Sequence, residues 1–147
     1  MSSAPQAPYL LVHPDRIEPF SRGTGVVTLP HVGRWNSTES SLTTGMTVFE
    51  PGTGIPLHTH NVEECVLVLN GEATVTIGDD TFDVSAGAGT WVPADVPHRF
   101  VNRGDSRMRI YWVYGGPAVT RTICATGETF EHLSERDRTG SGKDQTP

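Results

Sequence analysis

Residues 52–64 read Gly-Thr-Gly-Ile-Pro-Leu-His-Thr-His-Asn-Val-Glu-Glu, and Gly71 follows a short distance later. Side chains alternate between the two faces of a β-strand, so His58 and His60 point the same way if this stretch is extended. Glu64 then brings a carboxylate after a short bend. Two imidazoles on one face, with a carboxylate close behind, supply three ligands to one ion without distorting the backbone. The stretch therefore predicts a metal site on a strand.

A second segment, residues 87–102, reads Gly-Ala-Gly-Thr-Trp-Val-Pro-Ala-Asp-Val-Pro-His-Arg-Phe-Val-Asn and offers His98 at the start of a further strand. Three nitrogens and one oxygen suit iron, manganese, nickel, copper, cobalt or zinc, whereas calcium and magnesium prefer oxygen ligands alone. We therefore expect one divalent transition metal ion, of open identity, with a ligand set of His58, His60, Glu64 and His98.

The chain as a whole shows the pattern of an all-β domain. Short segments rich in Val, Thr, Ile and aromatic residues are separated by Gly, Pro, Asn and Asp, and none carries a long helical stripe. One turn of helix is expected at 128–133. The expected strands are 24–28, 43–50, 55–59, 63–69, 72–77, 80–84, 89–92, 97–102, 107–114 and 118–124.

The length of 147 residues suits one domain. Residues 1–8 are small, polar and interrupted by proline, and residues 134–147 are charged and rich in Gly and Ser. We expect both to be solvated, flexible tails around a single domain at 9–133. Because no internal repeat is visible, one barrel is preferred over a tandem pair.

Composition excludes several classes of partner. The formal net charge of −6 repels phosphate backbones, so nucleic acid is not expected. The longest apolar run, residues 65–69, is far shorter than the ~20 residues of a membrane helix, and the N-terminus lacks a secretion signal. We therefore expect no membrane partner and a cytoplasmic protein. Cys65 and Cys124 lack a paired spacing and are expected to be reduced core thiols.

The two segments resemble the two signatures of the cupin superfamily. Every fixed position of the first signature matches, and the second has four positions in register; the matching residues are Gly52, His58, His60, Glu64, Gly71, Gly87, Pro93, His98 and Asn102. Asp95 stands where the family usually has glycine. Aspartate also tolerates left-handed backbone geometry, so we expect an intact site. The resemblance covers roughly residues 40–115.

The resemblance implies a cupin double-stranded β-helix, a jelly-roll barrel of two antiparallel sheets. The metal ligands of the family carry over to His58, His60, Glu64 and His98. A cupin that kept its fold while its site is empty is the alternative, and the presence of all four ligand types argues against it.

Other side chains are harder to place, because sequence does not fix strand register. The residues expected to line the cavity are Met46, Val48 and Phe100, together with Tyr111 and Val113 on the late strand or, as the alternative, Ile110, Trp112 and Tyr114. His13, His31 and His132 have no partners at ligand spacing and are expected to be packed or surface residues. Trp35 and Trp91 are expected at a homodimer interface.

Four protein ligands leave one or two positions of the ion open, as in catalytic metal sites. We therefore expect an enzyme acting on a small organic molecule, with dioxygenase chemistry first, because many one-barrel cupins with this ligand set are similar to known dioxygenases. Lyase, isomerase, cyclase or decarboxylase activity remains open. So does a non-catalytic binding or sensing module, although residues 1–42 show no helix-turn-helix pattern of the kind that regulators carry.

Overall fold

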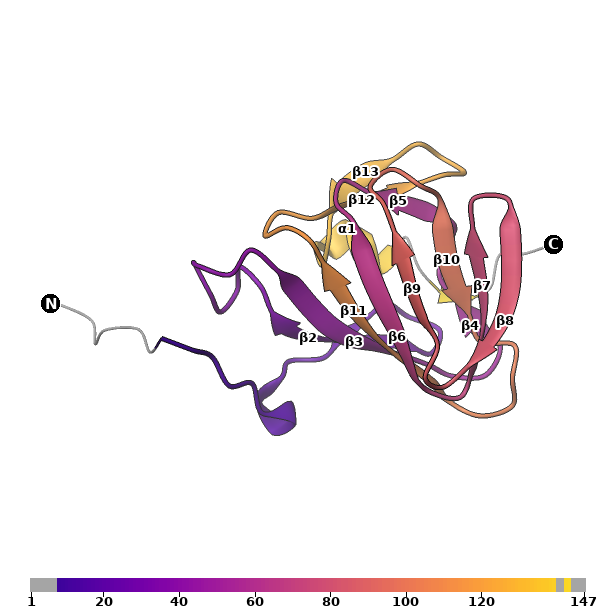
Figure 1. Ribbon diagram of the computed structural model, residues 1–147, viewed down its shortest axis with the longest axis horizontal. Coiled ribbons are helices and arrows are strands. Elements are labelled where there is room, and N and C mark those ends of the chain that lie inside the picture. The colour runs from indigo at the N-terminus through magenta and orange to yellow at the C-terminus, as the bar shows by residue number, and fades with distance from the viewer. Residues whose placement is uncertain (1–7, 140–141, 144–147) are drawn as a thin grey trace, which may run out of the picture.

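A computed structural model describes residues 8–139 and 142–143 and shows two antiparallel sheets that face each other. The first sheet has six strands (Figure 1). In spatial order these are β1 (Phe20–Ser21), β2 (Val26–Val32), β3 (Thr43–Phe49), β11 (Met108–Tyr114), β6 (Glu64–Asn70) and β9 (Gly89–Val92).

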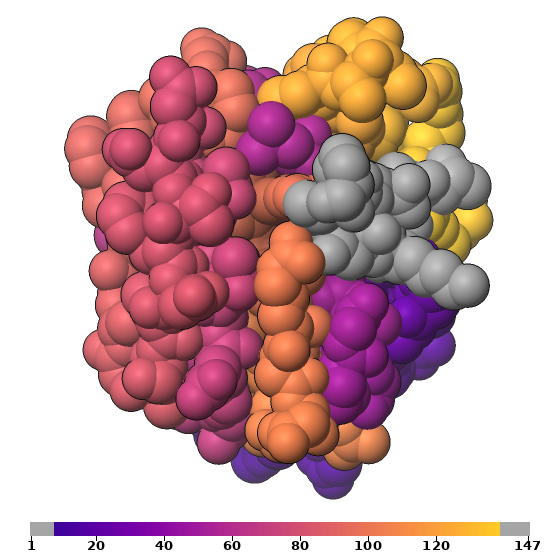
Figure 2. All heavy atoms as spheres, turned by 90° about the vertical axis from the view of Figure 1, so that its right-hand side faces the viewer, coloured from indigo at the N-terminus to yellow at the C-terminus, as the bar shows by residue number. Residues whose placement is uncertain are grey.

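The second sheet carries most of the segments that were expected to hold the site. Its main path contains β13 (Thr129–Glu131), β12 (Thr120–Ile123), β5 (His58–His60), β10 (His98–Val101), β4 (Thr53–Gly54) and β14 (Gly142–Lys143). β10 also pairs with β7 (Glu72–Ile77), which forms a hairpin with β8 (Asp80–Ser85). This hairpin covers one side of the molecule in Figure 2. The short helices are η1 (Pro14–Arg16) and α1 (Glu135–Thr139).

The hydrophobic core lies between the sheets and follows the alternation of each strand. In β11, for example, Met108, Ile110, Trp112 and Tyr114 are buried while the residues between them are more exposed. The core cluster consists of Val26, Phe49, Ile55, Val66, Val68, Ala73, Val75, Phe100, Met108, Ile110, Trp112, Tyr114 and Val119. The all-β jelly-roll fold expected from the sequence is confirmed.

The backbone conformation explains one residue in each of the two sequence motifs. Gly71 has φ +78°, and a Cβ atom there would lie 2.5 Å from the carbonyl oxygen of Arg107, so only glycine fits this turn between β6 and β7. Asp95 has φ 66°, in the left-handed region. The aspartate therefore adopts the backbone geometry that glycine usually supplies, as the sequence led us to expect.

Most expected strands are present within a few residues, and the differences are at the ends. The helical turn expected at 128–133 is wrong, because residues 129–131 form β13 against β12. The tail expected at 134–147 is also ordered in part: α1 lies within it, and Asp137 is fully buried. The charged sequence of residues 134–147 did not reveal this order, because Asp137 is buried through contacts with residues outside its own segment, such as Arg22. Residues 1–7, 140–141 and 144–147 of the expected tails lie outside the described residues.

The two cysteines are free, as expected, but both are exposed and so are not core thiols. Cys65 alternates with buried neighbours on β6 and faces outward. No helix in the described part of the chain is long and apolar enough to cross a membrane.

The outer face of the first sheet is unusually apolar. Leu29, Met46, Tyr111 and Leu67 lie in register across β2, β3, β11 and β6, and the neighbouring row pairs Cys65 with Trp91. Trp91 is 59% exposed and Leu67 is 43% exposed. A contiguous apolar face of this kind marks a protein–protein interface in many soluble proteins. The homodimer expected from the sequence stays a prediction, and this face is where we place its interface.

We predict that Leu67→Glu shifts the protein from dimer to monomer, because a carboxylate buried without a partner in an apolar interface is costly. The molar mass is measured by light scattering after size-exclusion chromatography. Phe82→Glu is the matched control, since Phe82 is exposed to a similar degree but lies on β8 of the other sheet. A wild-type protein that is monomeric at all concentrations contradicts the prediction.

Candidate metal centre

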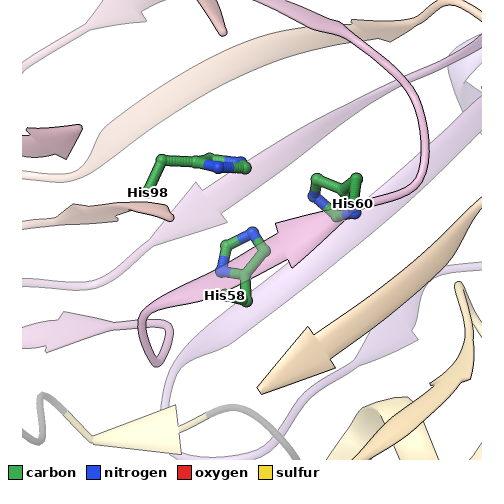
Figure 3. Close-up of side chains that lie close together, drawn as sticks. All are labelled: His58, His60 and His98. Atoms are coloured by element: carbon green, nitrogen blue, oxygen red, sulfur yellow. The ribbon is translucent and has the colours of Figure 1, made fainter. Parts of the chain in front are cut away.

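His58, His60 and His98 come together because of strand parity and pairing. His58 and His60 lie on the same face of β5, and both are buried while Thr59 between them is more exposed. β10 runs antiparallel to β5, with His98 directly opposite His58. The three rings therefore face a common space inside the barrel (Figure 3). One ring nitrogen of each imidazole lies within 4.8 Å of those of the other two.

The backbone orients each of these rings through its Nδ1 atom. Nδ1 of His58 lies 2.7 Å from the carbonyl oxygen of Pro56, Nδ1 of His98 lies 2.9 Å from that of Val96, and Nδ1 of His60 lies 2.9 Å from that of Thr120. A carbonyl oxygen only accepts hydrogen bonds, so each Nδ1 carries the proton. The lone pairs of the neutral rings therefore lie on the Nε2 atoms, which is how proteins prepare histidine for a metal.

Glu64 reaches the same space from the first residue of β6. Its Oε1 atom lies 2.9 Å from Nε2 of His98. When Nδ1 of His98 carries the proton, Nε2 of His98 presents a lone pair to the carboxylate oxygen of Glu64. These two electron-rich atoms repel each other unless a proton or a metal cation lies between them. Nε2 of His98 is buried and has no hydrogen bond of acceptable geometry to the described residues. The donor set therefore fits a cation.

Burial sets the protonation of the site. It lowers the pKa of His60 to about 3, with Arg121 and His98 acting in the same direction and Glu64 opposing. Burial likewise places the pKa of His58 well below its ordinary value, assisted by the charge of Arg121. Burial alone would raise the pKa of Glu64, but its contacts with His98 and His60 lower it. Neutral imidazoles and an ionised carboxylate are the forms that bind metals.

Tyr114 is the fifth polar group at this point. Its hydroxyl lies 3.2 Å from Nε2 of His60, and its ring packs against that imidazole with centroids 4.6 Å apart. Burial raises the pKa of Tyr114 well above its ordinary value, and the negative charge of Glu64 adds to the effect. The phenol therefore stays protonated and offers a hydrogen-bond donor to the site.

A small internal cavity adjoins the ligands. Its volume is about 20 Å³, little more than a single water molecule requires. The lining combines apolar walls with several charged or polar groups: Arg22, Thr47, Phe49, Ile55, His58, Glu64, His98, Phe100, Ile110, Trp112, Tyr114, Arg121 and His132.

Some of the residues expected to line the cavity face inward and others face outward, according to their alternation along the strand. Phe100 lines the cavity, whereas Met46, Val48 and Tyr111 are only partly buried and lie on the outer face of the first sheet. The alternative set on β11, Ile110, Trp112 and Tyr114, faces inward. β3 and β11 carry apolar residues on both faces, so their sequences did not reveal which parity points to the cavity.

Sequence reasoning missed several charged and polar residues of the interior. Arg22, Arg121 and Asp137 are buried together near the site, and His132, expected to be a packed or surface residue, lines the cavity. His132 also stacks edge-on against Trp112 and Tyr114, with ring centroids 5.1 and 5.0 Å apart. These residues lie singly in the sequence, and no local spacing marks them.

Comparison with known proteins agrees with this architecture. A family profile described as Cupin domain matches residues 45–114. Among curated proteins, the chain is 37% identical over 67 residues to polyketide synthase CurC of Streptomyces cyaneus. That match covers 45% of this chain and 44% of CurC, so the chain matches less than half the length of that relative.

Two solved structures share the fold at low sequence identity. Oxalate decarboxylase of Bacillus subtilis, in a study of its Mn(II) centres, is 21% identical with a TM-score of 0.70, over 84% of this chain and 35% of its own. A cupin described as a sugar phosphate isomerase from Silicibacter pomeroyi is 21% identical with a TM-score of 0.67, over 84% of this chain and 87% of its own. The profile match assigns residues 45–114 to a Cupin domain, and the two solved structures share its fold.

Proposed function

We propose that the protein is a metal-dependent enzyme that acts on a small organic molecule, with His58, His60, Glu64 and His98 as the metal ligands. The convergence of the three imidazoles carries this proposal, since every Nδ1 is engaged by a backbone carbonyl and the Nε2 atoms carry the lone pairs that an ion would need. Binding of an ion at Nε2 of His60 would replace the contact of that atom with the Tyr114 hydroxyl. The description of Mn(II) centres in a structure of the same fold supports a divalent transition metal.

The surroundings of the ligands suit catalysis. A divalent ion with four protein ligands supplies Lewis-acid polarisation and open positions for a substrate oxygen or for dioxygen. Phe49, Phe100 and Trp112 form apolar walls around a cavity of about 20 Å³, and burial of this kind strengthens electrostatic interactions inside the barrel. Tyr114 holds a proton beside the ligands and can donate a hydrogen bond to an oxygen atom of the substrate.

Within this proposal, oxidation by dioxygen is our first candidate reaction, supported by the small, enclosed cavity and the mixed nitrogen and oxygen ligand set. Proton transfer, as in an isomerase, lyase or cyclase, is the second candidate. One observation favours proton transfer. The buried phenol of Tyr114 stays protonated next to the ligands, where its hydrogen bond would stabilise the negative oxygen of an enolate.

The metal site is tested by elemental analysis of protein purified without a histidine tag. We predict one transition metal ion per chain in the wild type, and loss of stoichiometric metal in His58→Ala and in His60→Ala while the strands stay folded. Removal of the ion by a chelator is expected to lower the melting temperature, because binding stabilises only the folded state. His13→Ala, which changes an exposed histidine, is the control. Equal metal content in the wild type and in all three variants contradicts the assignment of His58 and His60 as metal ligands.

The reaction class is tested with an oxygen electrode on iron(II)-loaded protein and a panel of diketones, catechols and enols. Oxygen uptake that depends on His58 and His60 is the expected result. The same measurement is repeated on protein loaded with each of the other candidate metals. Absence of uptake with every metal overturns the dioxygenase candidate.

The proton-transfer candidate predicts exchange of the α-proton of a diketone with D₂O, followed by NMR. Tyr114→Phe should slow this exchange by roughly 10²-fold or more, the usual contribution of a positioned proton donor, while metal content is unchanged. An exchange rate that the substitution leaves intact removes Tyr114 from the chemistry.

The metal-free protein should lose stability in acid. Because the pKa of His60 is about 3 when folded and about 6.5 when unfolded, the unfolded chain binds more protons between these values. The stability conferred by neutral, buried His60 is therefore present above pH 6.5 and is lost as pH falls toward 3. Urea unfolding in chelator at pH 7, 5.5 and 4.5 measures the slope. His60→Gln should flatten the slope, whereas His13→Gln should leave it unchanged.

A further inference from the structure

Arg22 and Arg121 are buried inside the barrel beside the candidate metal ligands. Their exposed fractions are 3% and 2%, and both side chains line the cavity that also includes His58, Glu64 and His98. Arginine is almost never fully buried unless it is paired with an anion, because desolvation of the guanidinium is costly. The pair therefore marks a place where the interior is built to receive negative charge.

A single carboxylate of this chain already meets both guanidinium groups. Oδ1 of Asp137 in α1 lies 2.9 Å from Nη1 of Arg22 and 3.3 Å from Nε of Arg121. Burial would raise the pKa of Asp137, but the charges of Arg121 and Arg22 outweigh that effect and hold the pKa below its ordinary value. The spacing of the two arginines thus fits one ionised carboxylate.

The charges of the interior change when a metal ion is added. Among the described residues, the buried acidic and basic side chains other than histidine are Arg22, Arg121, Glu64 and Asp137, which balance two against two. A divalent ion held by neutral imidazoles adds two positive charges. The loaded interior therefore carries a net positive charge, which attracts an anionic ligand toward it. Exchange of a ligand carboxylate for that of Asp137 leaves this net charge unchanged.

Polar contacts fasten the segment that carries Asp137. Oδ2 of Asp137 accepts a hydrogen bond from the backbone N–H of Leu133, and Arg138 donates from Nη1 to the carbonyl oxygen of Ser21. α1 itself contains no apolar residue to anchor it in the core. A competing anion can therefore displace α1 without exposing an apolar residue of that helix. Movement that reaches His132 also breaks its ring contacts with Trp112 and Tyr114.

Access to the cavity also depends on this segment. The cavity of about 20 Å³ is too small for an organic molecule as it stands. His132 lines both the cavity and an outer groove of about 590 Å³, whose walls include Phe20, Trp35 and Leu133. Movement of residues 132–138 would therefore bring the groove and the cavity together.

We propose that Arg22 and Arg121 form the subsite for the carboxylate group of an organic substrate, and that Asp137 occupies this subsite until the substrate replaces it. The inference rests on the proposed function, since the rest of the substrate would then face the metal ligands. It assigns the substrate class as small organic carboxylates.

The test on the wild-type protein uses pyruvate and its neutral analogue pyruvamide as probes. Pyruvate should displace Asp137 and so speed hydrogen exchange of the Leu133 amide, which Asp137 otherwise holds. Pyruvamide should leave that exchange unchanged. The measurement is made on metal-free and on Mn(II)-loaded protein. Exchange that does not respond to pyruvate, or responds equally to pyruvamide, overturns the proposal.

Two variants test the same subsite by calorimetry. Asp137→Asn removes the competing charge at constant shape, and should bind pyruvate about 10-fold or more tightly than the wild type. Arg121→Met should weaken binding by at least a similar factor, with Arg109→Met on the exposed side of β11 as its control. A folded Asp137→Asn protein whose affinity for pyruvate is not increased also overturns the proposal, and if that variant does not fold, the wild-type exchange decides alone.

Metal content measured on the same samples separates the two proposals. Protein that holds its ion but shows no pyruvate response contradicts only the carboxylate subsite. Protein without affinity for any transition metal contradicts the proposed enzyme, whatever pyruvate does.

Discussion

The hydrogen bonds between the histidine Nδ1 atoms and three backbone carbonyls are the constraint on which the site depends. They fix the tautomer and the direction of His58, His60 and His98 before any ligand arrives. The carbonyls belong to Pro56, Val96 and Thr120, so the position of each ring is set by the path of the main chain. Thr120 lies on β12, and Pro56 and Val96 come two residues before the histidines that begin β5 and β10, so the paired strands fix all three carbonyls closely. The site is therefore organised in advance of binding.

The all-β class and the shared face of His58 and His60 could be predicted from the sequence because their signals are local. The jelly-roll barrel, and the place of His98 beside the other two, followed from the resemblance of the two segments to the cupin signatures. Alternation places His58 and His60 on one face, and the turn at Gly71 requires a residue without a side chain. The lining residues could not be predicted in the same way. Met46 and Tyr111 are apolar residues on a face that points away from the cavity. Alternation shows which residues share a face, but it does not show which face points inward.

The buried charges were invisible to sequence reasoning for a different reason. Arg22 lies about a hundred residues before Arg121 and Asp137, and each of the three looks like an ordinary surface residue in its own segment. Only tertiary structure brings them together. Their burial also explains why part of the expected C-terminal tail is ordered: Asp137 fixes α1 by charge. The interior thus combines a site for a cation with a site for an anion, an arrangement suited to orienting a charged substrate.

The most direct test of the account is the anomalous scattering of a crystal of the metal-loaded protein, recorded on either side of the absorption edge of the bound element. The account predicts one peak per chain, at about 2.0–2.3 Å from Nε2 of His58, His60 and His98 and from a carboxylate oxygen of Glu64. A peak elsewhere on the protein, or ligation of the ion through Nδ1 with the backbone hydrogen bonds broken, would contradict it.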